Sequence, residues 1–130
     1  MDEKEILNQF GEMLISDVRT QTLKQLDKIF SGELKSEKAQ KLHAKLCHFS
    51  PQDMEVIKEI TTEAVDRSLF KVMFMFESSE DFIIGAVNED EIVDLNDMSD
   101  GLGGEYFEWV EKYSKSNGND DEWSLSQIGH

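Results

Sequence analysis

The feature that most constrains the fold is a helical spacing of apolar residues along two long stretches of the chain. In residues 3–30, side chains such as Leu7, Phe10 and Leu14 recur at intervals of three and four. A second pattern of the same kind runs from Ile57 to Phe76. Since an α-helix has 3.6 residues per turn, this spacing places the apolar side chains on one face of each segment. We therefore predict a core built from long amphipathic helices.

Cap residues indicate where these helices begin and end. Ser31-Gly32 is predicted to end the first helix, because Gly adopts the left-handed conformation readily. Ser36 suits the N-cap of a second helix over 37–48. Ser50 to Asp53 is the strongest start signal, with Pro in the first helical position and Asp three residues after the cap. Residues 69–76 fit either the end of this third helix or a central strand, and we favour the helix because no breaker precedes them.

The C-terminal half predicts a hairpin and one more helix. Two strand-like runs surround a loop that lacks the Asn-Gly or Asp-Gly pair of a tight turn. These runs are followed by a loop and a final helix. The predicted ranges are 82–87 and 91–95 for the strands, 96–101 for the loop and 102–115 for the helix.

The fold class expected is therefore mainly α (α+β). A three-helix antiparallel core carries a small β-hairpin and a C-terminal helix. Residues 1–115 are predicted to form a single domain. Residues 116–130 are rich in Ser, Asn, Gly and Asp, so we expect a tail that is disordered or not native to the protein.

The charge of the chain is strongly one-sided. Twelve acidic residues and no Lys, Arg or His lie between Glu77 and Glu111, and the net charge is −15. Residues 19–48 instead hold seven bases and three acids. The acidic field works against a nucleic-acid partner, because each phosphate contact requires a base. A basic protein is the partner that the acid block favours, and the charge asymmetry also fits a homodimer.

Membrane insertion and an oxidising compartment are not expected. The longest apolar run, Val72 to Phe76, is far too short to span a bilayer. The only cysteine is Cys47, so the chain cannot form an internal disulfide. These features predict a cytoplasmic protein without contact to a membrane.

The loop from Asp94 to Glu105 is the weak candidate for a metal site. An EF-hand with Gly101 in the sixth position would place Met98 third and Phe107 twelfth. Neither side chain supplies the required oxygen, so the EF-hand is excluded. A less regular cation site could use Asp94, Asp97, Asp100 and Glu105. The alternative is that these acids serve turns and that Ser99 or Asp100 caps the final helix, while Gly103 and Gly104 admit a close backbone or ligand.

Two other clusters have ordinary interpretations. His43 and Cys47 share a helical face, but zinc needs more ligands than these, and Cys47 is expected to pack at the edge of the core. Glu55, Glu59 and Glu63 recur every four residues near Asp66 and are expected to form a solvated face. The sequence contains no cofactor-binding motif, so we predict no cofactor.

The last predicted helix carries an aromatic stripe. Leu102, Tyr106, Trp109 and Tyr113 share one face. Aromatic side chains dominate protein interfaces, so Tyr106 and Trp109 are candidates for partner binding together with the acids of the loop. The alternative is that the stripe docks this helix onto its own core.

The segment Ser99 to Glu105, with Trp109 and Tyr113-Ser114-Lys115 after it, resembles the C-terminal end of a group of small acidic bacterial proteins of unknown function. The Thr62 to Asp66 segment is similar to that group as well. The resemblance implies a bacterial, single-domain protein and carries no function.

Three hypotheses follow for the function. The first is a non-enzymatic acidic binding protein, similar to an immunity protein or inhibitor, that blocks a basic protein. The second is a cation-binding module or metal-dependent enzyme that uses the loop from Asp94 to Glu105. The third is a homodimeric structural protein in which the basic middle of one chain faces the acidic end of the other.

Overall fold

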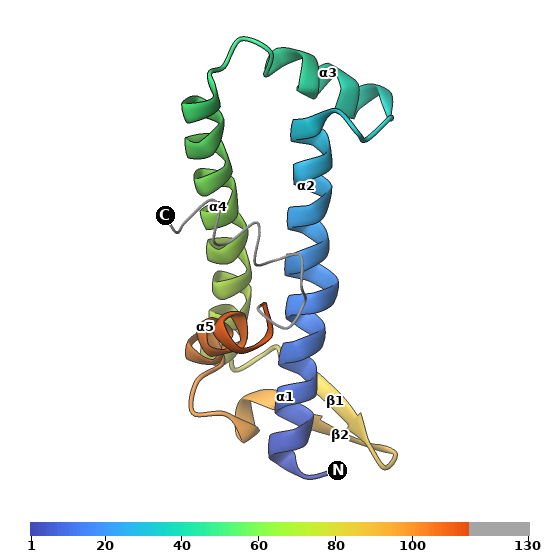
Figure 1. The fold of residues 1–130 in the computed structure, drawn as a ribbon. Helices are drawn as coiled ribbons and strands as arrows, with labels where there is room; N and C mark the ends of the chain where they lie inside the picture. The colour runs from blue at the N-terminus through green and yellow to red at the C-terminus, as the bar shows by residue number, and fades with distance from the viewer. Residues whose placement is uncertain (115–130) are drawn as a thin grey trace.

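The structure is a computed structural model and describes residues 1–114. It is mainly helical, with a two-stranded antiparallel hairpin and a C-terminal helix, as the sequence predicts. Figure 1 shows two long antiparallel helices joined at one end by a short helix, with the hairpin and the last helix at the other end. The predicted tail, residues 116–130, lies outside the described residues.

The first long helix consists of α1 (Glu3–Met13), a π-helical segment η1 (Leu14–Thr20) and α2 (Gln21–Ser31). The Asp2 carboxylate caps its start by accepting the Glu5 amide at 2.9 Å. Gly32 ends it in the left-handed conformation, with φ of 81°. The predicted helix over 3–30 is therefore confirmed. The π-helical segment was not predicted, because periodicity alone does not show a local widening of the helix.

The second long helix, α4 (Pro51–Ser78), begins with the capping box that the sequence predicts. The Ser50 hydroxyl accepts the Asp53 amide at 3.0 Å, and the Asp53 carboxylate accepts the Ser50 amide at 3.3 Å. Residues 69–76 are helical, so the favoured alternative is confirmed. The short α3 (Glu37–Lys45) starts at Ser36 as predicted and lies across the far end of the two long helices (Figure 1).

The hairpin is shorter than predicted. Strands β1 (Gly85–Asn88) and β2 (Glu91–Asp94) pair around a two-residue turn of Glu89 and Asp90. Both turn residues have positive φ, 51° and 71°, although neither is Gly or Asn. A 3₁₀ helix, η2 (Leu95–Met98), forms the first half of the predicted loop, and α5 (Leu102–Tyr113) follows.

The main core lies at the end of the molecule where α5 meets both long helices. Its buried side chains come from α1, η1, α4, η2 and α5, and they are Ile6, Leu7, Ile15, Met73, Leu95, Leu102, Tyr106 and Trp109. Few side chains are buried in the arm formed by α2, α3 and the first half of α4; these are Leu23, Ala39 and Thr62. Among the described helices, none combines the length and apolar content needed to cross a bilayer.

The contact between Gly11 and Trp109 fixes how closely α5 approaches α1. A Cβ atom on Gly11 would lie 2.5 Å from the Trp109 ring, so the indole occupies the space of the missing side chain. The Phe10 ring meets the same indole edge-on, with the ring centroids 5.7 Å apart. Trp109 is only 3% exposed. A larger residue at position 11 would therefore push on a ring that has no free space to enter.

We expect Gly11→Ala to destabilise the protein even though Ala is the better helix former. Overpacking of a core costs about 1–3 kcal/mol, which outweighs the roughly 1 kcal/mol that Ala gains over Gly in a helix. Gly104→Ala is the matched control, because a Cβ atom there meets nothing within 4 Å. Urea denaturation should show a lower free energy of unfolding for Gly11→Ala and an unchanged or higher one for Gly104→Ala. Equal effects would contradict the described contact.

Candidate functional site

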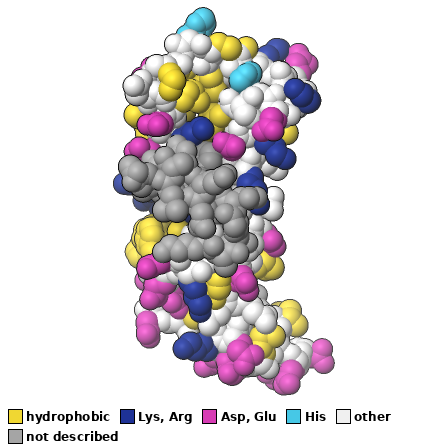
Figure 2. Space-filling view, viewed as in Figure 1, with side chains coloured by type: hydrophobic (Ala, Val, Ile, Leu, Met, Phe, Trp, Pro, Cys, Tyr) yellow, Lys and Arg dark blue, Asp and Glu magenta, His cyan; other side chains and the backbone are white. Residues whose placement is uncertain are grey.

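The fold collects the acidic residues at the end that holds the main core. The acid block between Glu77 and Glu111 folds beside the start of α1. Residues 1–13 and 77–114 together hold sixteen acids and two bases, Lys4 and Lys112. Figure 2 shows acidic side chains over this lower end of the molecule. The basic stretch, residues 19–48, runs along α2 and α3 toward the opposite end (Figure 1).

An acidic pocket lies where the end of α4 meets the start of α5. Its volume is about 480 Å³, and it is lined by Glu77, Asp100, Gly101, Gly104, Glu105 and Glu108. The lining holds four carboxyl groups and no base. Carboxylates at such short range repel one another, so the pocket attracts cationic groups.

One of these carboxylates has a structural role. Glu77 extends from α4 and its Oε1 accepts the Gly103 amide at 2.8 Å, which satisfies one of the free amides at the start of α5. The prediction that Ser99 or Asp100 caps this helix is therefore wrong: N-cap Gly101 makes no side-chain cap, and Ser99 accepts the Gly101 amide instead. The remaining pocket acids are Asp100, Glu105 and Glu108.

Helix α4 packs so closely against position 103 that the glycine there leaves no room for a side chain. A Cβ atom on Gly103 would lie 3.0 Å from the Phe70 ring and 3.3 Å from the Glu77 carboxylate. The neighbour expected from the sequence was a backbone or a ligand, and the structure places three side chains of α4 there, those of Phe70, Phe74 and Glu77. The neighbouring Gly104 meets nothing within 4 Å, so it borders the open side of the pocket.

The pKa of Glu105 reflects the burial and the mutual repulsion of the acids in this pocket. Burial of its carboxyl group raises its pKa above the ordinary value, and the nearby Glu108 and Asp100 raise it further. A hydrogen bond with Ser99 acts in the opposite direction. The raised pKa means that the ionised form of Glu105 is less stable here than in water.

The other predicted site residues are dispersed. Asp94 is half-buried and accepts the Asn96 amide at 2.9 Å, so it caps η2, on which Asp97 lies exposed. Within residues 1–114, no three His, Cys, Asp or Glu side chains form a group that could hold a metal ion. Tyr106 and Trp109 are 0% and 3% exposed, so they dock α5 onto the core and a partner cannot reach them.

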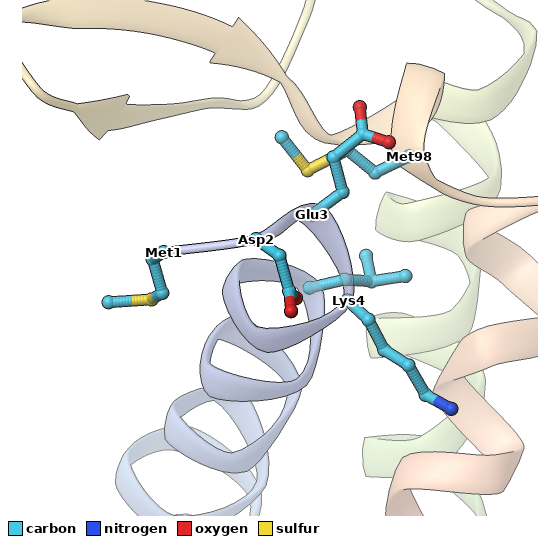
Figure 3. Close-up of a pocket in the computed structure, with 6 residues that line it drawn as sticks. Met1, Asp2, Glu3, Lys4 and Met98 are labelled. Atoms are coloured by element: carbon cyan, nitrogen blue, oxygen red, sulfur yellow. The ribbon is translucent and has the colours of Figure 1, made fainter.

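A second pocket borders the acidic end at the N-terminus. It has a volume of about 620 Å³ and is lined by Met1, Asp2, Glu3, Lys4, Leu7 and Met98. Figure 3 shows Met98 of η2 beside Glu3, while Lys4 points away from both. Asp2 is engaged as the cap of α1. The pocket offers no cluster of reactive groups and extends the surface of the acidic end.

A buried polar network connects three helices next to the core. Arg19 of η1 donates from Nε and Nη2 to the two carboxylate oxygens of Asp66, at 2.6 and 3.2 Å. The Tyr106 hydroxyl donates to the same carboxylate at 2.6 Å. Burial and the Asp66 carboxylate raise the pKa of Tyr106, so its hydroxyl keeps its proton and stays a donor. Arg19 is 2% exposed, so without Asp66 its charge would be buried without compensation, which is strongly destabilising.

This network was missed in the sequence. Asp66 was assigned to a solvated face because it follows Glu55, Glu59 and Glu63, and that assignment is wrong. Arg19 stands four residues after buried Ile15 and four before buried Leu23. A base between two core positions of one helix face was the signal that a buried acid had to meet it.

Within residues 1–114, no further His, Cys, Asp or Glu joins His43 and Cys47 in a group that could hold a metal ion. His43 Nδ1 lies 3.1 Å from the carbonyl oxygen of Phe30, and its ring packs on Gly32, so the histidine holds α3 against the end of α2. Cys47 is exposed, which corrects the expectation that it packs at the edge of the core. Its place after the end of α3 leaves the thiol in solvent.

We expect the buried network to dominate the stability of the α5 docking. Asp66→Ala leaves the Arg19 guanidinium without its carboxylate in a buried position, which costs about 3–5 kcal/mol. Tyr106→Phe removes one hydrogen bond to a charged group, a loss of about 1.5–3 kcal/mol. Urea denaturation measures both. Glu63→Ala is the control: it breaks an exposed pair with Arg67, which contributes about 0.5 kcal/mol at most. A loss for Asp66→Ala no larger than the control would contradict a buried charge.

The raised pKa of Glu105 predicts a pH-dependent effect of its removal. The folded state binds this proton more tightly than the unfolded state, so Glu105 costs stability progressively as the pH rises above the ordinary glutamate pKa of 4.5. Glu105→Gln should therefore raise Tm at pH 7 and leave it unchanged near pH 3, where the wild-type carboxyl is protonated in both states. Exposed Glu111→Gln on the same helix should raise Tm less at pH 7. The reverse order would overturn the assignment.

Comparisons with known proteins assign no family to this chain. No family model matches it, and neither do the curated proteins or the solved structures. A function therefore cannot be transferred from a relative to any of these residues.

Proposed function

We propose that this chain is a non-enzymatic binding protein whose acidic end binds a basic surface of another protein, in the manner of an inhibitor or immunity protein. One observation carries the proposal: the fold gathers sixteen acids and two bases from residues 1–13 and 77–114 at one end of the molecule. An opposed charge on the partner would steer the encounter and suppress other partners.

The pocket between α4 and α5 is the centre of the proposed surface. Asp100, Glu105 and Glu108 border a space of about 480 Å³, large enough to admit a Lys or Arg side chain. The pKa of Glu105 is raised by burial and by its two acidic neighbours. A cationic side chain in this pocket would remove that repulsion, so free energy stored in the unbound protein would be released on binding. The pocket thereby favours a cation over a neutral or anionic ligand.

The proposal also includes a cellular compartment and a resemblance to other proteins. A cytoplasmic location suits the exposed, unpaired thiol of Cys47, because reducing conditions keep such a thiol free. The resemblance of Ser99 to Lys115 to small acidic bacterial proteins stays a prediction and supplies no partner. The proposal therefore specifies the chemistry of the partner, a basic protein surface.

The test is capture of partners with immobilised protein from the source lysate at low ionic strength, followed by elution with salt. We expect a basic protein that elutes at moderate salt, since the interaction is electrostatic. Binding of the purified partner is then measured for the triple variant Asp100→Asn, Glu105→Gln and Glu108→Gln. Its affinity should fall by about tenfold or more, which corresponds to about 1.4 kcal/mol.

The control carries the same change in net charge at another place. Glu55→Gln, Glu59→Gln and Glu63→Gln neutralise three exposed acids on α4 outside the acidic pocket. This variant should keep the affinity of the wild type for the captured protein. An equal loss in both variants would show attraction to net charge alone, and a lysate without any salt-sensitive basic partner would refute the proposal.

A further inference from the structure

Strand β1 has one edge that no other strand covers. Among residues 1–114 the sheet has only two strands, so β1 pairs with β2 on one side and is open on the other. Native proteins protect such edges with charged residues or proline, because an open edge pairs readily with another chain. Residues 85–88 of β1 are Gly, Ala, Val and Asn, so this edge carries neither kind of protection.

The hydrogen-bond pattern shows which backbone groups of β1 face the open edge. The Leu95 amide donates to the Ile84 carbonyl oxygen at 2.9 Å, so Ile84 faces the side of β2. Since such positions alternate along an antiparallel strand, every second residue after Ile84 faces β2 as well. The backbone groups of Gly85 and Val87 therefore point outward. Each of these two residues offers one N–H donor and one carbonyl acceptor to a further strand.

A groove lies beside this edge, with α1 on its other side. Its volume is about 270 Å³, and it is lined by residues 85–88 and by side chains of α1 that include Ile6, Phe10 and Met13. Figure 1 shows the hairpin next to α1 at this end of the molecule. Met13 is 56% exposed, so the groove is bordered by a large apolar side chain without cover. A strand added to β1 would place every second side chain against these residues of α1. Main-chain hydrogen bonds together with pockets for alternate side chains are the means by which sheet edges bind extended peptides.

The charges around the edge favour a basic occupant. The turn after β1 is formed by Glu89 and Asp90. Residues 72–111, which include the whole hairpin, contain no Lys, Arg or His. The single base of α1 is Lys4, which lies about 160° around the helix from Ile6 and therefore points away from the groove. Because opposite charge steers association and suppresses wrong partners, a segment that carries Lys or Arg is favoured here.

The outer face of the hairpin suits lysine side chains. Val87 and Ile92 lie opposite each other on this face and are 78% and 72% exposed. The apolar stem of a lysine on a neighbouring strand covers such side chains while its ammonium group stays near water and carboxylates. Glu89 and Asp90 follow Val87 by two and three residues and supply these carboxylates. Alternating apolar and basic residues therefore match the two faces that a third strand would have.

We propose that the open edge of β1 binds an extended segment of a partner protein, in which basic residues alternate with apolar ones, as a third strand of the sheet. The apolar side chains enter the groove beside α1, and the basic ones lie on the outer face. A second copy of the chain is a poorer occupant, because its own hairpin would bring further acids to the same edge.

This inference goes beyond the acidic pocket. The edge and its groove share no lining residue with that pocket. The test of the edge uses a synthetic peptide instead of a captured partner, so this proposal and the proposed function can fail separately.

Binding of a peptide to the full chain tests the added strand. The probe has blocked ends and alternating lysine and valine, and it is long enough to pair with the whole of β1. We expect saturable binding by titration calorimetry, and none for the matching peptide with glutamate in place of lysine. Alternate amides of a strand point to opposite edges, so methylation of the lysine amides and of the valine amides should differ, one abolishing binding and the other preserving it. Absence of binding by the lysine peptide, equal binding of the glutamate peptide, or equal behaviour of the two methylated peptides would overturn the proposal.

Two proline variants form a matched pair in the protein. Val87→Pro removes the amide that faces the open edge of β1, and Ile92→Pro removes the amide that faces the opposite edge, that of β2. Neither amide takes part in the pairing of the two strands, so both variants keep the hydrogen bonds of the hairpin. We expect Val87→Pro to weaken binding of the lysine peptide by about tenfold or more, and Ile92→Pro to bind it as the wild type does. Equal affinities of the two folded variants, with folding verified by circular dichroism melts, would refute the added strand.

Amide hydrogen exchange of the wild-type protein shows whether the edge is already occupied. In the free protein the Gly85 and Val87 amides should exchange fast, whereas the Ala86 amide, which faces β2, should be protected. Addition of the lysine peptide should slow exchange at Gly85 and Val87. Protection of these two amides in the free protein would assign the edge to a second copy or to residues 115–130, and the proposal would be wrong.

Discussion

The pairing of buried Arg19 with Asp66 is the interaction on which the arrangement of the helices depends. A guanidinium that is 2% exposed cannot lose its carboxylate without a large penalty, so η1 and α4 must stay in one register. Tyr106 donates to the same carboxylate and thereby ties α5 to both helices. The π-helical segment that carries Arg19 also buries the next residue, Thr20.

The docking of α5 follows from this register through two close contacts with glycines. At one end of α5, Glu77 of α4 caps the helix at Gly103, and at its middle, Trp109 fills the space that Gly11 of α1 leaves open. A change in the register of the long helices would displace both contacts. The acidic pocket is lined by the end of α4, the turn before α5 and its first turns, so its shape depends on the same buried network. Stability and the proposed binding surface are therefore coupled.

Local signals in the sequence predicted most of the fold, and interactions across the chain escaped prediction. The cap at Ser36, the capping box at Ser50 and the helical reading of 69–76 depend on neighbouring residues and were correct. Glu77 caps α5 from 26 residues away, and Asp66 meets Arg19 from 47 residues away. Periodicity holds no information about such partners. The same limit explains why Asp94, assigned to a cation loop, caps η2 instead, while Asp100 and Glu105 line a pocket with Glu77 and Glu108. It also explains why the aromatic stripe is buried.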